Sequence, residues 1–298
     1  MQWRYAKDWC ASVSIRSSLI LVNLIAFIIV FVLFMKAEPI LRIQSLGHLL
    51  FSSSWHPLKG QFGFLSFIVG TLEVTAIAMV LSIPVSLLSA IYLSEYAHKY
   101  FKGLVRLMLD ILAGIPSVIY GLCGVIAIVP FVHSLGGFFG NPTTGYSLLA
   151  GGIILAIMVT PVIISVSMEV LAAIPDEART SSLALGTTRW ETVRYVVLKG
   201  SLRGIIAAIV LGFSRAFGET IAVLMVVGNV AKIPTSLFDP AYPLPALIAN
   251  NYGEMMSIPL YDSALLFAAL VLLVLVGAFG LVANITLSRL TKKGYYFS

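Results

Sequence analysis

The chain is organised around the hydrophobic stretch Arg203–Val230, which reads RGIIAAIVLGFSRAFGETIAVLMVVGNV. It is long and apolar enough to cross a bilayer as one helix. Arg215 and Glu219 nevertheless lie near its middle, where an ionisable side chain is costly and usually functional. Because they are four residues apart, a continuous helix would place both on one face.

The rest of this predicted helix separates small from bulky side chains. A face of small residues allows another helix or a solute to approach closely, whereas a bulky face suits lipid or apolar neighbours. We therefore expect the helix to line a polar pathway with its charges turned inward; the alternative is a structural ion pair between helices. The small residues are Ala208, Gly212, Ser214, Ala216, Gly218 and Ala222, and the bulky ones are Ile206, Phe213, Phe217 and Leu224.

The composition of the whole chain is that of an integral membrane protein. Of its 298 residues, 59% are hydrophobic and 11% are charged, whereas a soluble domain carries about a quarter charged residues. We expect an all-α, polytopic protein with six transmembrane helices. The predicted spans are Ser18–Phe34, Phe67–Leu93, Leu104–Val132, Ser147–Leu171, Arg203–Val230 and Ser263–Leu290.

The basic residues predict the orientation. If the N-terminus is cytoplasmic, the outer connections hold Lys36, Arg42, Lys59 and Lys232, and nearly all other Lys and Arg side chains face the cytoplasm. Basic residues concentrate on the cytoplasmic side of membrane proteins. The pattern therefore predicts both termini inside, and it accounts for the net charge of +6 without nucleic acid.

Several spans contain residues that disturb a helix. Pro84, Pro161 and the sequence Gly114-Ile115-Pro116 fall within predicted spans. Such breaks allow a transporter to move or to open a cavity, although a static kink explains each proline equally well. Glu73, which lies between Thr71 and Thr75, could face the pathway or cap a contact between helices.

The sequence offers no catalytic or cofactor motif. Its histidines and cysteines lack metal-ligand spacing, so we expect no metal site and no cofactor bound by this chain. It has no Gly-Lys dipeptide and hence no phosphate-binding loop for ATP. If ATP drives transport, ATP and Mg must bind to a separate ATPase chain, and this chain is not an enzyme.

The connection between Ala172 and Leu202 predicts two short helices. Pro175, followed by acidic residues, marks a helix start, and Gly186 marks its end after Leu185. The sequence Thr188-Arg189-Trp190-Glu191 then fits a capping box, and Trp190, Val193, Val197 and Leu198 would share one side of the second helix. We predict a rigid knob on the cytoplasmic side; the alternative is an amphipathic connector on the membrane surface.

This connection resembles the EAA loop of ABC importer permeases. The family pattern is Glu-Ala-Ala, three residues, Gly, nine residues, Ile, one residue, Leu-Pro. Here Gly186, the spacing and Leu198 are kept, but Thr180-Ser181-Ser182 replaces Glu-Ala-Ala, and Lys199 replaces the proline.

Three further segments are distinctive: Leu112–Gly121, Ile154–Met158 with Pro161, and Arg215–Val223 followed by Gly228-Asn229. These segments resemble the permeases of phosphate-specific importers, of the PstC type. The resemblance covers most of the chain after the first span.

The resemblance implies a type I ABC importer permease fold in the cytoplasmic (inner) membrane of a prokaryote. A PstA-like permease would be the second subunit, a PstB-like ATPase dimer would bind the knobs, and a PstS-like protein would deliver phosphate. The predicted pathway residues are Arg215, Glu219, Ser214, Thr220 and Glu73. The predicted ATPase-coupling residues are Thr180, Ser181, Ser182, Leu185, Gly186, Thr187 and Trp190.

Two regions are expected. Residues 1–66 would form a cytoplasmic segment, the first transmembrane helix and an outer loop, and residues 67–298 would form a five-helix permease core with its coupling loop at about 172–202. In the empty pathway Glu219 would balance Arg215, and arriving phosphate would compete for the guanidinium, helped by Ser214, Thr220 or backbone donors. The uncompensated Glu219 would then repel the anion, so that binding stays weak enough for release. The alternatives are a sulfate or molybdate permease, a proton-coupled carrier that uses Glu73 and Glu219, and a scaffold that moves no solute.

Overall fold

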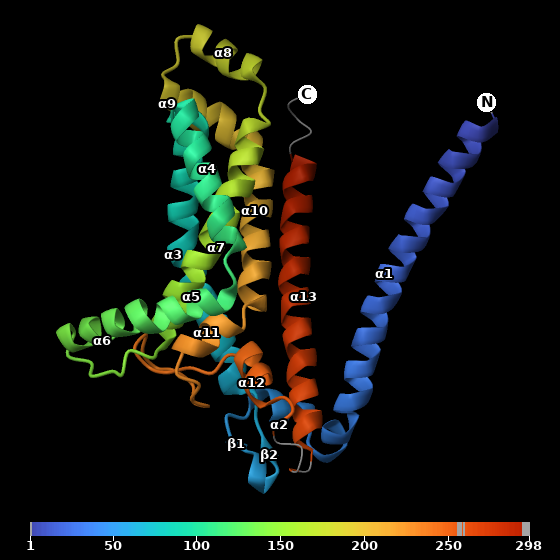
Figure 1. The fold of residues 1–298 in the computed structure, drawn as a ribbon, viewed down its shortest axis with the longest axis vertical. Helices are drawn as coiled ribbons and strands as arrows, with labels where there is room; N and C mark the ends of the chain where they lie inside the picture. The colour runs from blue at the N-terminus through green and yellow to red at the C-terminus, as the bar shows by residue number, and fades with distance from the viewer. Residues whose placement is uncertain (1, 255–257, 259, 294–298) are drawn as a thin grey trace.

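The computed structural model describes residues 2–254, 258 and 260–293. The first residue of the predicted region 1–66, the last five of the predicted region 67–298 and part of an outer loop lie outside the described residues. Within this part the chain is helical apart from one hairpin, formed by β1 (Trp55–His56) and β2 (Gln61–Phe62) around the turn η1 (Pro57–Lys59). Figure 1 shows an elongated bundle whose long helices run roughly side by side.

Six helices among the described residues are long and apolar enough to cross a membrane. This agrees with the predicted number and with the all-α fold class. The second and fourth agree closely with the predicted spans, because their apolar runs end where the helices end. The six are Ala11–Ile43, Leu65–Tyr96, Ser117–Phe138, Leu148–Ala172, Arg189–Gly218 and Tyr261–Thr286.

The prediction of one span over Leu104–Val132 is wrong. Helix α4 (Lys99–Gly114) ends before Pro116, and a new helix begins with α5 (Ser117–Cys123), continues through the π-helical turn η3 (Gly124–Ile128) and ends with α6 (Val129–Phe138). Proline lacks an N–H and forces the preceding residue into an extended conformation, which Ile115 adopts with ψ of 130°. As a result, α4 runs along the bundle while α6 lies across it (Figure 1).

Helix α7 (Leu148–Ala172) lies at the centre of the bundle. In the apolar stretch of α7, 61% of the residues are buried. The corresponding share is 39% for the span that contains α3 (Leu65–Ile91) and lower for the other spans. Glycines allow the close approach: a Cβ on Gly152 would collide with Ile77 of α3, and one on Gly212 would collide with Ile163. Pro161 and Pro84 lie inside these helices without ending them.

Helix α1 (Gln2–Ile43) stands apart from the bundle. It contacts α13 (Tyr261–Lys293) near the end where α2 (Leu46–Phe51) and the hairpin lie, and it diverges from the bundle towards its own N-terminus (Figure 1). Ala37 and Ile40 are buried in a cluster with Phe267, whereas the apolar window of the helix has no buried residue.

The two ends of the molecule differ. Helix α1 begins, α13 ends, and α8 (Asp176–Ala184) and α9 (Arg189–Thr192) lie at one end, while the hairpin and α12 (Leu244–Asn251) lie at the other (Figure 1). A chain that crosses a membrane an even number of times has both termini at the same end, as seen here. This arrangement places the predicted knob at the same end as the N-terminal helix start.

Candidate transport site and coupling segment

The predicted continuous helix over Arg203–Val230 is interrupted at its centre. Helix α10 (Leu198–Gly218) ends at Gly218, Glu219 is extended with φ −74° and ψ 126°, and α11 (Ile221–Val226) follows. The prediction that Arg215 and Glu219 share one helical face is therefore wrong. The interruption is stabilised locally, because the Glu219 Oε1 accepts hydrogen bonds from the backbone N–H groups of Thr220 at 3.2 Å and Ala222 at 3.5 Å. Backbone N–H groups at a helix start have no helical partner and favour such an acceptor.

Arg215 lies in the last turn of α10, where the helix dipole favours a positive charge. Its side chain is partly buried. The structure describes Arg215, Glu219 and Glu73, and Arg215 forms no ion pair with either glutamate. The guanidinium thus lies at a helix junction, and its N–H groups can donate to an anion.

The two predicted hydroxyl residues lie on different sides of this junction. Ser214 is exposed, donates to the Val210 carbonyl at 3.1 Å, and lines an apolar cavity of about 220 Å³ between α10 and α13. Thr220 follows Glu219 directly and donates to the Gly218 carbonyl at 3.3 Å. The structure therefore brings Thr220 to the junction and places Ser214 against α13.

Glu73 lies in α3 and is partly buried. Its Oε2 is buried and has no hydrogen-bond partner. A buried carboxylate oxygen without a partner is energetically unfavourable. Protonation of the carboxylate, a bound cation or a hydrogen-bond donor from a mobile group would stabilise it. The neighbouring Thr71 has a structural role, because its hydroxyl donates to the Phe67 carbonyl at 2.7 Å and accepts from the Leu244 N–H at 2.8 Å.

The predicted knob is present. Helix α8 ends at Ala184, Gly186 adopts a φ of +86°, and Thr188 and Glu191 form the predicted capping box at the start of α9. The Thr188 Oγ1 accepts from the Glu191 N–H at 3.2 Å, and the Glu191 Oε2 accepts from the Thr188 N–H at 2.7 Å. Glycine populates positive φ at little cost, which is why the chain turns here.

Three hydroxyl groups hold α8 against α9. The Ser182 Oγ lies 2.9 Å from the Thr187 Oγ1 and 3.1 Å from the Thr192 Oγ1, and the two threonine oxygens are 3.0 Å apart. Ser182 and Thr192 are buried. Of the predicted coupling residues, Ser182 and Thr187 therefore stabilise the knob from within. Thr192 was not predicted, although it is a hydroxyl residue within reach of the same turn.

The tip of the knob exposes large apolar side chains. Leu185 is 86% exposed, Trp190 51% and Leu183 46%. Trp190 was predicted to share one side of the second helix with Val193 and Val197; those two valines, in the π-helical turn η4 (Val193–Val197), are buried, whereas Trp190 is exposed. Thr180 and Ser181 are also exposed, and the Thr180 hydroxyl donates to backbone carbonyls of its own helix. Apolar side chains gathered at such a tip are typical of a protein-binding surface.

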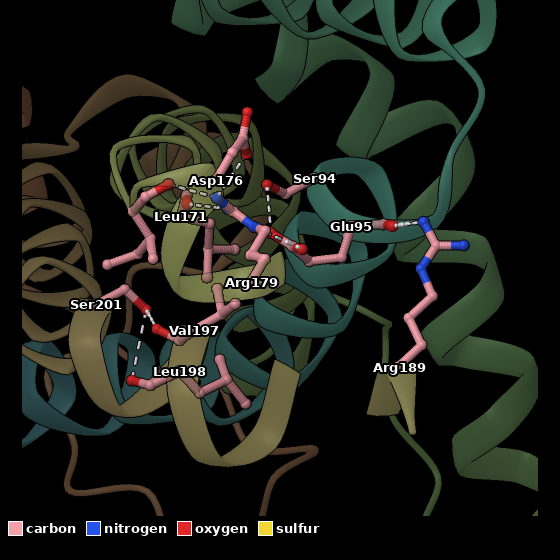
Figure 2. Close-up of polar contacts among 10 residues, drawn as sticks. Ser94, Glu95, Leu171, Asp176, Arg179, Arg189, Val197, Leu198 and Ser201 are labelled. Carbon is pink, nitrogen blue, oxygen red and sulfur yellow. Dashed lines mark hydrogen bonds and ion pairs between the residues drawn. The ribbon is translucent and has the colours of Figure 1, made fainter. Parts of the chain in front are cut away.

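Sequence analysis missed a polar cluster between the knob and α3. Glu95 lies in the π-helical turn η2 (Tyr92–Tyr96), which extends α3, and forms an ion pair with Arg179 of α8. Figure 2 shows the Arg179 guanidinium between Glu95 and the backbone of α7, with Arg189 reaching Glu95 from the other side. The available signal was a lone acid at the end of a predicted span and arginines in the following loop.

The fold defines a polytopic membrane protein with a helical knob at one end that exposes large apolar side chains, and it resembles solved ABC importers. The inward-facing MetNI methionine ABC transporter superposes with a TM-score of 0.57 at 20% identity, covering 74% of this chain and 93% of that chain. The crystal structure of an amino acid ABC transporter with histidines superposes with a TM-score of 0.54 at 17% identity, covering 76% of this chain and 93% of that chain. These similarities establish the type I importer permease fold.

The sequence comparisons establish the family. A family model described as binding-protein-dependent transport system inner membrane component matches residues 82–293. The chain is 35% identical to the phosphate transport system permease protein PstC of Xylella fastidiosa, over 85% of this chain and 82% of that protein. It is 38% identical to the probable ABC transporter permease protein YqgH of Bacillus subtilis, over 80% and 77%, and 34% identical to a probable PstC of Methanocaldococcus jannaschii, over 89% and 90%. The chain belongs to the family of binding-protein-dependent transport system inner membrane components.

Proposed function

We propose that this chain is a membrane-spanning permease subunit of an ATP-driven importer that passes inorganic phosphate across the cytoplasmic membrane of a prokaryote. The family and the fold support an importer permease, and the names of the similar PstC proteins support phosphate as the substrate. The other oxyanions, sulfate and molybdate, remain alternatives that substrate competition separates.

The observation that carries the proposal is the position of Arg215. A partly buried guanidinium without an ion pair, at the junction of two helices, offers several N–H donors in a plane that matches phosphate oxygens. Arginine remains charged at any pH that the cell meets, so it can compensate an anion in a poorly hydrated pathway.

Glu219 bonds to the start of α11 instead of balancing Arg215. Its carboxylate occupies the start of α11, where free N–H groups would otherwise attract an anion. We propose that Glu219 keeps that helix start closed to phosphate and repels the anion at Arg215. Binding at Arg215 then stays weak enough for release. Thr220, which follows directly, is the hydroxyl residue proposed to assist, and Glu73 is proposed to face the same pathway from α3.

Energy would enter through the knob. We propose that Leu183, Leu185 and Trp190, around the turn at Gly186, dock on a PstB-like ATPase dimer that binds ATP and Mg. Thr180 and Ser181 flank this surface. A PstA-like permease would complete the pathway, and a PstS-like protein would deliver phosphate at the end formed by the hairpin and α12.

Reconstitution tests the proposal. The chain is purified with whatever subunits accompany it, inserted into vesicles with the delivery protein on one side and ATP on the other, and supplied with radiolabelled phosphate. We expect uptake that requires ATP, persists with a protonophore, and is not reduced by excess sulfate or molybdate. Uptake that collapses with the protonophore but needs no ATP would identify a proton-coupled carrier. Uptake that sulfate or molybdate abolishes would assign the complex to that anion.

A further inference from the structure

Arg179 joins the knob to two transmembrane helices. Its Nη2 lies 3.0 Å from the Glu95 Oε1, and its Nε donates to the Glu95 Oε2 at 3.3 Å, so the guanidinium grips both carboxylate oxygens. The Arg179 side chain is 18% exposed and that of Glu95 9%. A bidentate, largely buried ion pair of this kind fixes the orientation of the two side chains as well as their separation.

The same guanidinium also caps the end of α7. Its Nη2 donates to the Leu171 carbonyl at 2.9 Å, and its Nη1 donates to the Ile174 carbonyl (Figure 2). The last carbonyls of a helix have no helical partner, and a positive charge is favourable there. The Nη1 is also 3.1 Å from the Asp176 Oδ1, at the start of α8 itself. One side chain therefore fastens α8 to both α3 and α7.

The second half of the knob is fastened to the same turn. Arg189, the first residue of α9, donates to the backbone carbonyl of Glu95, and its guanidinium lies 4.9 Å from the ring centroid of Tyr96. The turn η2 is π-helical, with the Ala97 N–H bonded to the Tyr92 carbonyl at 2.9 Å. Such turns inside helices are frequent at functional sites. The helices on both sides of the Gly186 turn thus contact the same turn, η2, at the end of α3.

A second ion pair at this end of the molecule has a different character. Arg106 of α4 and Glu169 of α7 are 3.2 Å apart, but their side chains are 59% and 65% exposed, and neither belongs to the knob. Exposed pairs contribute little because water screens them. The Arg106–Glu169 pair therefore provides a matched control for removing a carboxylate charge at the same end.

We propose that Glu95 and Arg179 are positioning residues for energy coupling: they make the knob move as one body with α3 and α7, so that a displacement of the knob reaches the pathway helices. This inference rests on the proposed function, because it assumes that an ATPase displaces the knob. Helix α10, which carries Arg215, is continuous with the second half of the knob through η4. Without the pair, the knob would bend at Gly186 and follow the ATPase without moving α3.

The test measures phosphate imported per ATP hydrolysed, in vesicles that contain the full complex. The variants are Glu95→Gln, Arg179→Gln, the double variant, and the control Glu169→Gln, with assembly checked by the amount of ATPase that copurifies. We expect at least a tenfold fall of the ratio in both single variants, no further fall in the double variant, and a ratio unchanged in the control. ATP hydrolysis itself should remain within about threefold of the wild-type rate.

A covalent reconnection completes the test. Glu95→Cys and Arg179→Cys are combined in a chain whose own cysteines are replaced by serine, and a short thiol crosslinker is added. We expect the crosslinked complex to regain most of the wild-type ratio and the untreated complex to stay uncoupled. A wild-type ratio in Glu95→Gln, a loss of assembly that the crosslinker does not repair, or a low ratio that persists after crosslinking would overturn the inference. The wild-type complex is measured first. If it imports no phosphate at all, the proposed function is wrong, and this outcome is distinguished from a failure of the coupling inference before any variant is measured.

Discussion

The Arg215 guanidinium and the Glu219 carboxylate lie on either side of a helix end. Arg215 belongs to the last turn of α10, while Glu219 is extended and its carboxylate accepts hydrogen bonds at the start of α11. The two charges therefore have separate partners: the helix end favours the cation, and the next helix start favours the anion. In the proposed pathway, a substrate anion would meet Arg215 without first breaking an ion pair.

This separation predicts different results for two substitutions of Glu219. In Glu219→Gln the amide oxygen can still accept from the Thr220 and Ala222 N–H groups, but the negative charge is lost. We expect the complex to assemble normally and to hold phosphate several-fold more tightly, with slower release. Glu219→Ala removes the acceptor as well and should destabilise the start of α11 by about 1 kcal/mol. Equilibrium binding of phosphate and thermal unfolding of the purified complex measure the two effects, and identical behaviour of the two variants would contradict this account.

The turn at Gly186 predicts a conformational rather than a steric penalty. A Cβ on Gly186 would have no atom within 4 Å, but its φ of +86° is unfavourable for any residue with a side chain. Gly186→Ala should cost about 1 kcal/mol and weaken binding of the ATPase partner about fivefold, since the knob must be formed to bind. Titration of the solubilised permease with the ATPase measures the affinity. The control is Gly103→Ala in α4, where the added methyl group also meets nothing and the backbone is helical. Equal affinities for the two variants would be inconsistent with the proposed docking surface.

The hydroxyl cluster inside the knob predicts a modest effect for Ser182→Ala. The two contacts of the Ser182 Oγ are lost, but the Thr187 and Thr192 hydroxyls, 3.0 Å apart, can still bond to each other, which limits the cost. We expect the local stability of α8 and α9 to fall by about 1 kcal/mol, read as faster amide hydrogen exchange in both helices. Ser181→Ala, at an exposed position of the same helix, is the control and should leave exchange unchanged.

Acid sensitivity is predicted for the loop that precedes α12. The Asp239 Oδ2 accepts from the Thr235 N–H at 2.9 Å, the Thr235 hydroxyl at 2.9 Å and the Ser236 N–H at 3.1 Å. These bonds, the Thr235 N–H first, hold the pKa of Asp239 below its ordinary value of 3.8. A lowered pKa in the folded protein means that the contribution to stability is fully present above 3.8 and disappears as the pH falls through the lowered value.

Amide hydrogen exchange checks this sign. The Thr235 and Ser236 amides should keep the same protection, corrected for the intrinsic exchange rate, from pH 7 down to about 5. They should lose protection only in stronger acid. In Asp239→Asn the protection should be lower and independent of pH over the whole range. Protection that already falls between pH 7 and 5 would show that another group controls this loop.

Sequence alone predicted those features that depend on local chemistry. Apolar runs gave six spans, and the glycine at 186 with the capping box of Thr188 and Glu191 gave the knob. The sequence did not give the break after Gly218, because no proline marks it and the residues on both sides favour a membrane helix. The break depends on the Glu219 side chain bonding to backbone that becomes free only when the helix ends.

The Glu95–Arg179 pair was also beyond sequence patterns. The two residues are 84 positions apart, and their contact depends on how the end of α3 packs beside the end of α7. The same is true of the unpartnered Glu73 oxygen, which only burial reveals. The break at Pro116 had a visible signal in its proline. The predicted span crossed it because the flanking residues are apolar throughout.

The role proposed for Arg215 is tested by measuring phosphate uptake by the Arg215→Gln complex in vesicles supplied with ATP. Glutamine keeps a polar side chain of similar length and removes only the charge and the fork of donors. We expect uptake to fall at least a hundredfold while the subunits still copurify, and Arg106→Gln, at the exposed pair with Glu169, to transport normally. Wild-type uptake by an assembled Arg215→Gln complex would contradict the claim that this guanidinium handles the anion.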